Sequence, residues 1–331
     1  MVNYLIIDQR KLKMSRLVRW LCRSKKQHYL TNQLLAFSTD NKKPSNTRAT
    51  PPPIRVSLTE SAGRGVFATR RIGAGDLIHT AKPIIAHPSL SSINTVCYYC
   101  LRNKLNSTDQ NVAFCGPECE QNAKVFYDVE KEAEWVAFHD YCRSNGFKYP
   151  LLVKRLACTI LSGAAHPEIL DILQPASLPH HILLEMEEGF NLLRQGFTKA
   201  DAGSEKMAFL TKKWYNNVLA RIRINAFRIE LAPGRYEDLL SSAAACVDAE
   251  AAVGNAVYML PSFYNHDCDP NAHIIWLENA DARVKALRDI EPDEELRICY
   301  IDASLDHNAR QTLLLEGFGF NCNCPRCSSG D

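Results

Sequence analysis

Four cysteines in the first half of the chain have the spacing of metal ligands. They form two close pairs, Cys97-x2-Cys100 and Cys115-x3-Cys119, which are separated by a 14-residue loop. Each pair can place two thiolates around one ion, and four thiolates suit a tetrahedral Zn²⁺ ion. Because protein would fill all four positions, such a site would be structural, with no open place for water. The alternatives are two reduced, buried pairs or disulfides.

A second group of cysteines lies near the C-terminus and comprises Cys322, Cys324 and Cys327. Three thiolates are one short of a closed zinc site, and Cys268 is the candidate for the fourth ligand. Such a centre would pin the C-terminal tail against the segment around Cys268. An open catalytic zinc is the alternative, but no nearby His-Glu pattern supports a metal-bound water. We therefore expect two zinc ions. The remaining cysteines are interpreted as small hydrophobic residues: Cys22, Cys142, Cys158, Cys246 and Cys299.

The composition is that of a globular protein. The chain has 331 residues, of which 46% are hydrophobic and 23% charged, which excludes a disordered, collagen-like or coiled-coil protein. This length favours two or three substructures. No run of about 18 mostly apolar residues occurs, so no membrane span is predicted. Thirteen cysteines are too few, for this size, to suggest a secreted disulfide scaffold.

The net charge of +2 is unevenly distributed along the chain. Residues 1–53 contain 11 basic and 2 acidic residues and carry +9, whereas the remainder, with 28 basic and 35 acidic residues, carries −7. A body with this balance lacks the basic surface of a nucleic-acid-binding protein. It suits a basic partner better, although the same charge also serves solubility.

The N-terminal arm is basic and amphipathic. Between Gln9 and Thr39 there are eight Lys or Arg residues and no acidic residue. This composition fits an organellar transit peptide, with Met14 as a more typical start than Met1. A plain disordered arm and a nuclear localisation signal are the alternatives. We therefore expect a mitochondrial or plastid location if the arm is a presequence, and otherwise a nuclear one.

The elements that must position these residues are strands at both ends of the folded region and helices between them. Helical periodicity runs from Leu152 to Leu161 and again from Leu210 to Ile222. The chain therefore reads as α+β, a β-rich unit interrupted by a cysteine module and a helical block. The predicted strands are Ile54–Leu58, Gly65–Ala68, Leu77–Ile85, Ala272–Leu277, Arg283–Leu287 and Glu295–Tyr300. The predicted divisions are a basic arm and linker, an N-terminal β-rich part, the cysteine module, a helical insertion, a C-terminal β-rich part and a tail: residues 1–53, 54–96, 97–119, 120–253, 254–302 and 303–331.

Four segments, in this order, carry a resemblance to a known family: SAGRGVFATRRIGAGD (61–76), NHDCDPN (265–271), EELRICYID (294–302) and GFNCNCPRC (319–327). The chain resembles SET-domain protein lysine methyltransferases. The cysteine module and helical insertion make it similar to the SET-and-MYND group and to plant trithorax-related SET proteins. The resemblance implies a β-rich SET fold split by a zinc module and helices and followed by a zinc-bound post-SET tail.

Two features depart from the family pattern. A full MYND module has more zinc ligands, and His139 and Cys142 resemble a remnant of the second set whose partners are missing. We therefore expect one zinc ion in this module. The family loop usually reads Asn-His-Ser-Cys, but here Asp267 replaces the serine. This change adds charge beside the site and removes neither Asn265 nor His266.

The resemblance implies methyl transfer from S-adenosylmethionine to a lysine amine. The substrate would be a lysine-containing protein, either a histone tail or an organellar protein, and we expect a monomer without direct contact to nucleic acid or membrane. The alternative is a catalytically silent scaffold whose zinc module and helices bind partner proteins. The presence of Tyr300, Asn265 and His266 favours the enzyme, because a scaffold has no need of them.

The resemblance also assigns roles to individual residues. Phe320 is expected to stack on the adenine of the methyl donor. Tyr300 is the expected catalytic residue, whose hydroxyl positions the amine, and Tyr258 is expected to line the lysine channel as a catalytic neighbour. The implied donor-binding residues are Gly63, Arg64, Gly65, Phe67, Asn265, His266, Tyr300 and Phe320.

Glu294 and Glu295 could suggest a pair of catalytic carboxyl groups. Adjacent residues on a strand point to opposite faces, so the two cannot act together across one substrate. We interpret both as structural and expect Glu295 to hydrogen-bond the loop that carries Asn265.

Overall fold

The computed structural model describes residues 51–104, 114–178, 180–198, 205–232 and 252–331. The basic arm up to residue 50, together with Cys22 and Cys246, lies outside the described residues. Within the described ranges, no helix is long and apolar enough to cross a membrane.

Segments from both ends of the folded region build the first sheet. Its strand order is β1-β2-β10-β7. β1 and β2 form an antiparallel hairpin, β10 pairs antiparallel with β2, and β7 pairs in parallel with β10. The strands are β1 (Ile54–Leu58), β2 (Arg64–Ala68), β7 (Asn265–His266) and β10 (Glu295–Ile298).

Two further antiparallel sheets have the strand orders β3-β9-β8 and β4-β6-β5. The single strand expected from residue 77 to 85 is two strands, because Pro83 lacks the N–H that a continuing ladder needs. Among its described residues, the block expected to be helical (120–253) also contains strand β5 and the first two residues of β6. The strands of these sheets are β3 (Leu77–Ala81), β9 (Ala282–Ala286) and β8 (Ala272–Ile275), and β4 (Ile85–Pro88), β6 (Ala252–Val257) and β5 (Ala226–Glu230).

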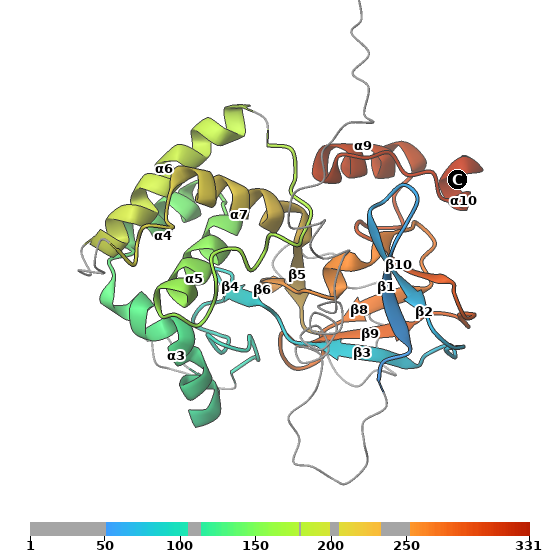
Figure 1. The fold of residues 1–331 in the computed structure, drawn as a ribbon, viewed down its shortest axis with the longest axis horizontal. Helices are drawn as coiled ribbons and strands as arrows, with labels where there is room; N and C mark the ends of the chain where they lie inside the picture. The colour runs from blue at the N-terminus through green and yellow to red at the C-terminus, as the bar shows by residue number, and fades with distance from the viewer. Residues whose placement is uncertain (1–50, 105–113, 179, 199–204, 233–251) are drawn as a thin grey trace, which may run out of the picture.

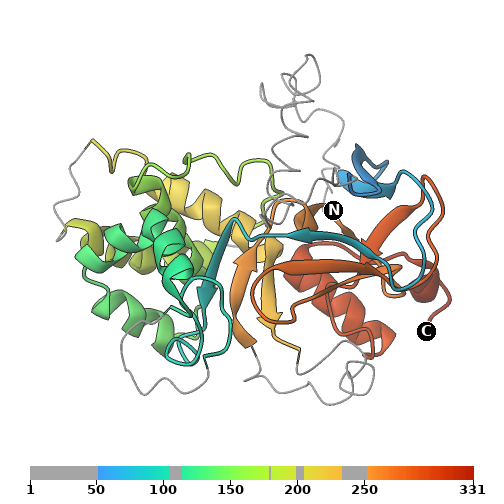
Figure 2. The same ribbon diagram turned by 90° about the horizontal axis from the view of Figure 1, so that it is seen from below.

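Five helices gather on one side of the molecule, and the β4-β6-β5 sheet lies between them and the other strands (Figure 1, Figure 2). This arrangement confirms the α+β architecture. The helices are α3 (Pro117–Glu132), α4 (Val136–Ser144), α5 (Tyr149–Leu161), α6 (His180–Thr198) and α7 (Lys212–Asn225).

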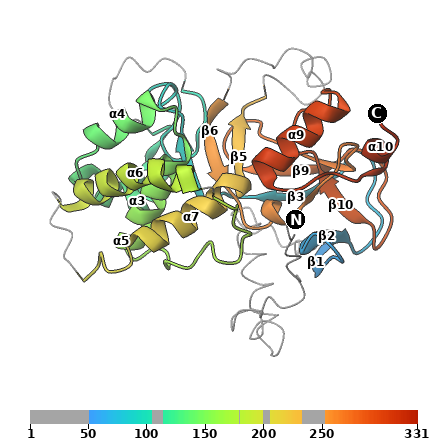
Figure 3. The same cartoon turned by 90° about the horizontal axis from the view of Figure 1, so that it is seen from above.

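The C-terminal segment packs beside the strands, on the side away from the helical block (Figure 3). It contains α9 (His307–Phe318) and the short α10 (Pro325–Ser328). The side chain of Asp306 caps α9 by accepting from the amide of Ala309 at 2.9 Å. Gly319, at φ +82°, ends the helix in the left-handed conformation that favours glycine.

A buried charge cluster joins the cysteine module to the helical block. Ten of the 13 residues of α5 are buried, among them Lys154 and Arg155. Both cations contact Glu130 of α3, whose carboxylate also accepts from the hydroxyl of Tyr98. Burial alone would raise the pKa of Glu130, but the charges of Lys154 and Arg155 outweigh it and lower this pKa to about 2. The cluster is therefore charged at neutral pH.

His139 belongs to this charge cluster. Its Nε2 lies 3.0 Å from Nζ of Lys154, and burial lowers the pKa of its ring to about 3. Cys142 is buried on the same helix. Across the described part of the chain, neither residue takes part in a group with the spacing of metal ligands.

Removing the carboxylate of the cluster should destabilise the fold strongly. We expect Glu130→Gln to lower the free energy of unfolding by about 3 to 5 kcal/mol, because Lys154 and Arg155 stay buried without a counter-charge. The matched control is Asp128→Asn on the same helix, which should change the stability little, because its ion pair with Lys131 is exposed and screened by solvent. Urea unfolding of the zinc-loaded protein measures both, and equal losses would contradict the assignment.

Candidate functional site

The pairing of β7 with β10 brings two of the recognised segments together. Asn265 lies opposite Arg297 and His266 lies opposite Ile298. Asn271, at the far end of the loop, fastens it to β10: its Oδ1 accepts from the Arg297 amide at 2.8 Å, and its Nδ2 donates to the Glu295 carbonyl at 2.8 Å. The loop is therefore held at both ends, with Asn265 and His266 beside the strand that leads to Tyr300.

Tyr300 lies two residues beyond the end of β10 in a largely buried position. Its hydroxyl donates to the carbonyl of Tyr264 at 2.6 Å. Its ring lies 4.9 Å from the ring of Phe318 and 5.3 Å from that of His266, measured between centroids. Burial raises the pKa of Tyr300, so the phenol is protonated at neutral pH. Because the proton points to Tyr264, the oxygen can present lone pairs elsewhere.

His266 connects Tyr300 to the second cysteine group. Its Nδ1 accepts from the backbone amide of Tyr300 at 3.1 Å, which requires that the ring proton sits on Nε2. Nε2 in turn lies 3.3 Å from Sγ of Cys268. Burial lowers the pKa of His266 to about 4, so the ring is neutral at pH 7. With both ring nitrogens engaged, only the ring face and the backbone of His266 can meet a ligand.

Two of the four glycines of the 61–76 segment, Gly63 and Gly65, form the glycine turn (residues 63–65) and have different roles. Gly63 adopts φ +77°, a conformation that favours glycine. Gly65 lies in β2, where a Cβ would come within 2.5 Å of Oε1 of Glu295. That oxygen accepts from Nδ2 of Asn265 at 2.7 Å, as the sequence predicted for Glu295. Gly65 thus makes room for this contact, and Asn265 also donates to the carbonyl of Arg64 at 3.1 Å.

Arg64 lies between the two glycines of the turn, and Phe67 follows the turn on β2. The guanidinium of Arg64 donates to the carbonyl of Ile172 at 2.8 Å, so the loop between α5 and α6 touches the turn. Phe67 lies opposite Glu295 in the β2–β10 register. The guanidinium of Arg55 lies over its ring, 5.0 Å from the ring centroid. Phe67 therefore packs within the hairpin, next to the glycine turn.

Phe320 reaches the site from the C-terminal tail. Its ring centroid lies 6.0 Å from that of His266 and 6.5 Å from that of Tyr300. The tail is held there by Gln311 of α9, which donates to the carbonyl of Cys322 at 2.7 Å and accepts from its amide at 2.9 Å. The half-buried Phe320 ring thus lies beside His266, and its stacking on the adenine of the donor stays a prediction.

Tyr258 requires a correction. It was expected to line a lysine channel, but its side chain has no exposed surface. Its hydroxyl donates to the carbonyl of Ala280 and accepts from Nε1 of Trp276 at 2.9 Å, and its ring lies 5.6 Å from that of Phe227. A residue enclosed in this way cannot wall a substrate channel. We therefore assign Tyr258 a packing role between the β4-β6-β5 sheet and its neighbours.

Sequence reasoning missed a further pair of residues behind Tyr300. Tyr264, whose carbonyl accepts from Tyr300, is itself buried and lies with its hydroxyl 2.9 Å from Nε2 of His79. His79 belongs to β3, far away in the sequence. No local pattern marks either residue. The one available signal was the position of Tyr264 directly before the Asn265 loop.

The first cysteine group has the geometry of a closed metal site. The sulfurs of Cys97, Cys100, Cys115 and Cys119 all lie within 4.8 Å of one another. The Cys100–Cys115 and Cys115–Cys119 separations are 3.6 and 3.4 Å. Tetrahedral zinc with bonds of about 2.3 Å places sulfurs about 3.8 Å apart, whereas a disulfide needs about 2.05 Å. The spacing fits zinc and excludes disulfides.

The second group confirms Cys268 as the partner of the three tail cysteines. All four sulfurs lie within 4.8 Å of one another, with Cys268 at 3.5 Å from Cys327 and 3.9 Å from Cys322. The fully buried Arg310 points Nη2 at Sγ of Cys327 from 3.7 Å. Four thiolates around Zn²⁺ carry a net charge of −2, which suits a buried guanidinium. The donor set therefore fits a structural zinc ion.

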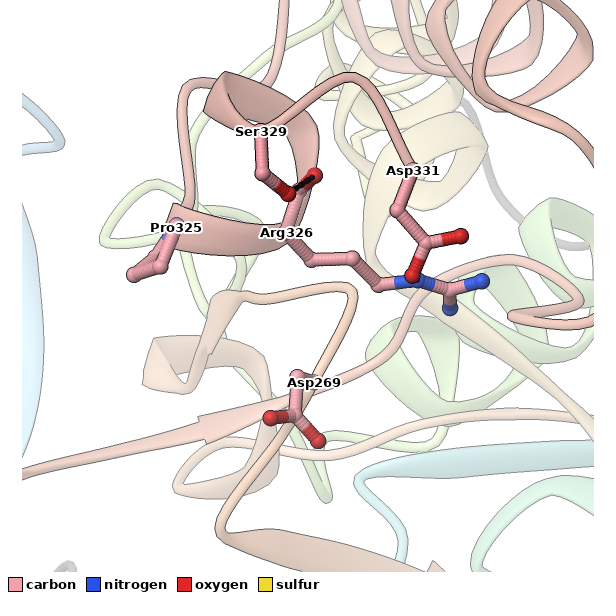
Figure 4. A pocket seen from close by; sticks show the side chains of 5 residues that line it. All are labelled: Asp269, Pro325, Arg326, Ser329 and Asp331. Carbon is pink, nitrogen blue, oxygen red and sulfur yellow. Dashed lines mark hydrogen bonds and ion pairs between the residues drawn. The ribbon is translucent and has the colours of Figure 1, made fainter.

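Arg326 of α10 ties this centre to its surroundings. Its Nη1 donates to the carbonyls of Ala303 at 2.7 Å and Cys268 at 3.4 Å, and its Nε lies 3.3 Å from the carboxylate of Asp331. Figure 4 shows this side chain extending toward Asp331 across an open hollow that Asp269 also lines. The tail is thereby fixed to the 265–271 loop by backbone contacts as well as by sulfur.

Metal analysis should find two zinc ions per chain. Cys268→Ala should retain one, because the first group is untouched, and should lose protection from hydrogen exchange over the last ten residues, since the anchor of the tail is gone. Cys158→Ala, a buried cysteine outside both groups, is the control and should keep two. A ratio near zero or four in the wild type, or two zinc ions in Cys268→Ala, would overturn the assignment.

Comparison with known proteins agrees with this architecture. The family model described as SET domain matches residues 63–301. Histone-lysine N-methyltransferase ATXR4 of Arabidopsis thaliana is 58% identical over 314 residues, which are 94% of this chain and 97% of that protein. The SET and MYND domain-containing protein DDB_G0292454 of Dictyostelium discoideum is 27% identical over 76% of this chain and 77% of its own length.

A more distant relative covers a similar share of this chain. Histone-lysine N-methyltransferase SMYD3 of Homo sapiens is 25% identical over 84% of this chain and 63% of its own length. The match of the family model extends from the glycine turn to the residue after Tyr300 and so includes Asn265 and His266. The extent of that match and the identity to the Arabidopsis protein show that the chain belongs to the SET-domain family.

Proposed function

We propose that this protein is a lysine methyltransferase that transfers a methyl group from S-adenosylmethionine to a lysine side chain of a protein. The observation that carries the proposal is the convergence of the glycine turn, Asn265 and His266 on β10, the strand that leads to Tyr300, with the Phe320 ring beside those of His266 and Tyr300. Relatives over most of the chain carry the name histone-lysine N-methyltransferase.

The donor-binding residues would be those that surround the glycine turn. The backbone of Arg64 and the side chain of Asn265 offer polar groups for the amino-acid part of the donor, and Phe320 beside His266 offers an aromatic face for the adenine. When bound, the donor supplies an electrophilic methyl group on a positively charged sulfur. The half-buried position of these residues excludes much of the water that would compete for such contacts.

Tyr300 would act on the incoming lysine by position. A lysine with an ordinary pKa of about 10.4 is less than one part in a thousand neutral at pH 7, so the site must favour the uncharged amine. Aromatic rings around Tyr300 desolvate the amine, which disfavours its charged form. The phenol proton is directed at the Tyr264 carbonyl, so the oxygen accepts an N–H of the amine and aims its lone pair. Such positioning contributes roughly 7 to 11 kcal/mol in favourable cases.

The substrate is proposed to be a basic protein segment, because the body of the chain is acidic. Residues 54–331 carry 28 basic and 35 acidic residues. We propose that the protein acts as a monomer without direct contact to nucleic acid or membrane. Incubation with labelled donor against histones and an organellar extract, followed by mass spectrometry of the labelled band, identifies the substrate. If wild-type protein binds no donor, a silent scaffold replaces the enzyme.

The catalytic role of Tyr300 predicts a loss of rate with donor affinity retained. Tyr300→Phe should slow single-turnover transfer about 100-fold, because one preorganised contact, worth about 2 to 3 kcal/mol, is lost in the transition state. Asn265→Ala should weaken donor binding as well as rate. Tyr127→Phe, on α3, is the control. Wild-type turnover in Tyr300→Phe on a verified substrate would refute the role.

We also propose that residues 1–53 direct the protein to an organelle, on the strength of their acid-free basic stretch. A fusion of these residues to a fluorescent protein should give mitochondrial or plastid signal. Nuclear fluorescence would favour a localisation signal and histone substrates on chromatin, and diffuse fluorescence would reduce the segment to a plain arm. A fusion in which Arg16, Arg19 and Arg23 are replaced by Gln should lose import, because the basic face is removed.

A further inference from the structure

We infer that Arg297 positions Asn265 for donor binding by bridging Asp267 and Glu295, an inference that rests on the function proposed above. Arg297 lies on β10 directly opposite Asn265 of β7. The proposal concerns its side chain, which donates to Glu295 and Asp267 and would act on the donor site through these two carboxylate partners. Arg297 is therefore a positioning residue.

The contacts of Arg297 form a clamp between β10 and the 265–271 loop, which we call the donor loop. Its Nε and Nη2 donate to Oε2 of Glu295 at 2.9 and 2.6 Å, which is a two-point contact with one oxygen. Its Nη1 lies 3.4 Å from Oδ2 of Asp267. The other oxygen of Glu295 accepts from Nδ2 of Asn265 at 2.7 Å. One guanidinium thus fixes the carboxylate that fixes the amide.

The clamp determines which end of the Asn265 amide is available. An amide nitrogen has two hydrogens, and here they point to Glu295 and to the carbonyl of Arg64 at 3.1 Å. The remaining polar group is Oδ1, an acceptor. An acceptor beside the glycine turn suits the ammonium group at the amino-acid end of the donor. Loss of the Glu295 contact would free the amide to turn and would remove this preference.

Charge explains why an arginine is needed at this position. The side chains of Asp267 and Glu295 are only 12% and 13% exposed, whereas that of Arg297 is 41% exposed. Two carboxylates in such partly buried positions repel each other unless a cation lies between them. Asp267 stands where the resembling family usually has serine, so the second negative charge comes from this residue. Arg297 would compensate that substitution.

Packing leaves the clamp little freedom. Gly65 faces Oε1 of Glu295 and Nδ2 of Asn265, at 2.5 and 3.2 Å from the position of a Cβ. The amide of Asp269 donates to Oδ1 of Asp267 at 3.0 Å, which fixes the second carboxylate from the loop side. Loss of the Arg297 contacts, or a side chain at position 65, would therefore displace Glu295.

The test is a double-mutant cycle on the zinc-loaded, full-length protein, with S-adenosylhomocysteine as the binding probe in calorimetry. Arg297→Ala should weaken its binding about tenfold, since the coupled charges lose their bridge. Asp267→Ser combined with Arg297→Ala should recover part of the affinity, to within about threefold of wild type, because the repulsion is gone but Glu295 still lacks the guanidinium that fixes it. Arg297→Lys should fall between these values. Arg71→Ala, which removes an exposed ion pair with Asp289, is the matched arginine control.

A second readout separates positioning from a general structural effect. At saturating donor, single-turnover transfer by Arg297→Ala should stay within about twofold of wild type, because Tyr300 is untouched, while the KM for the donor rises. Zinc content and melting temperature should match those of the Arg71→Ala control. A structural role would instead lower the rate, the zinc content and the melting temperature together.

Each outcome decides between the two claims. If wild type binds the probe and Arg297→Ala binds it with the same affinity, the clamp is wrong but the proposed function stands. The same holds if the double variant recovers none of the affinity that Arg297→Ala loses. Failure of wild type to bind the probe removes the proposed function and the clamp with it. If Arg297→Ala does not fold, Arg297→Lys and the double variant are compared with wild type instead. The clamp is then contradicted if Arg297→Lys binds S-adenosylhomocysteine like wild type while the double variant does not bind it.

Discussion

The parallel pairing of β7 with β10 is the constraint on which the site depends. Two residues of backbone pairing would be weak alone, but the side chain of Asn271 adds two hydrogen bonds to the same strand. This fastening sets the distance between Asn265 and Tyr300. Because β10 also pairs with β2, the glycine turn is drawn to the same place. Three separate segments thereby meet at β10, the strand that leads to Tyr300.

The second cysteine group extends this constraint to the tail. Cys268 belongs to the donor loop, so a zinc ion held there would join the loop to the residues that carry Phe320. His266 links Cys268 to Tyr300, because one of its ring nitrogens lies toward the Cys268 sulfur and the other accepts from the Tyr300 amide. A neutral ring is required for both contacts, and burial favours it. The metal centre thus supports the geometry of the site without taking part in chemistry.

Local sequence signals predicted the segments that form the site but not the contacts between them. Alternating apolar residues and glycine turns predicted β1 within its observed bounds, and the need for a fourth thiolate was sufficient to group Cys268 with the three cysteines of the tail. Position alone, however, could not separate a channel residue from a core residue. Tyr258 is near the donor loop in sequence, yet its hydroxyl finds both partners inside the core. Burial of that kind depends on the packing of distant segments.

Other features escaped prediction for the same reason. The expected helical block ends in β5 because this segment pairs with β6, which begins beyond residue 251. Periodicity measures which face is apolar and carries no information on such a partner. Likewise, the charge of Asp267 was visible in the sequence, but its counter-charge on Arg297 follows from the β7–β10 register. Contacts between residues so far apart in the sequence are determined by the order in which the strands pair.

The helical insertion is part of the site through one loop. The carbonyl of Ile172 accepts from Arg64, and Nε2 of Gln174 would lie 3.1 Å from a Cβ on Gly63. This loop is held in place, because the side chain of Asn225 at the end of α7 donates to the Gln174 carbonyl at 2.8 Å. The position of α7 therefore sets how closely the loop approaches the glycine turn. Since α7 packs against α5, and α5 carries the buried cations that bind Glu130, the charge cluster and the donor site share one rigid support.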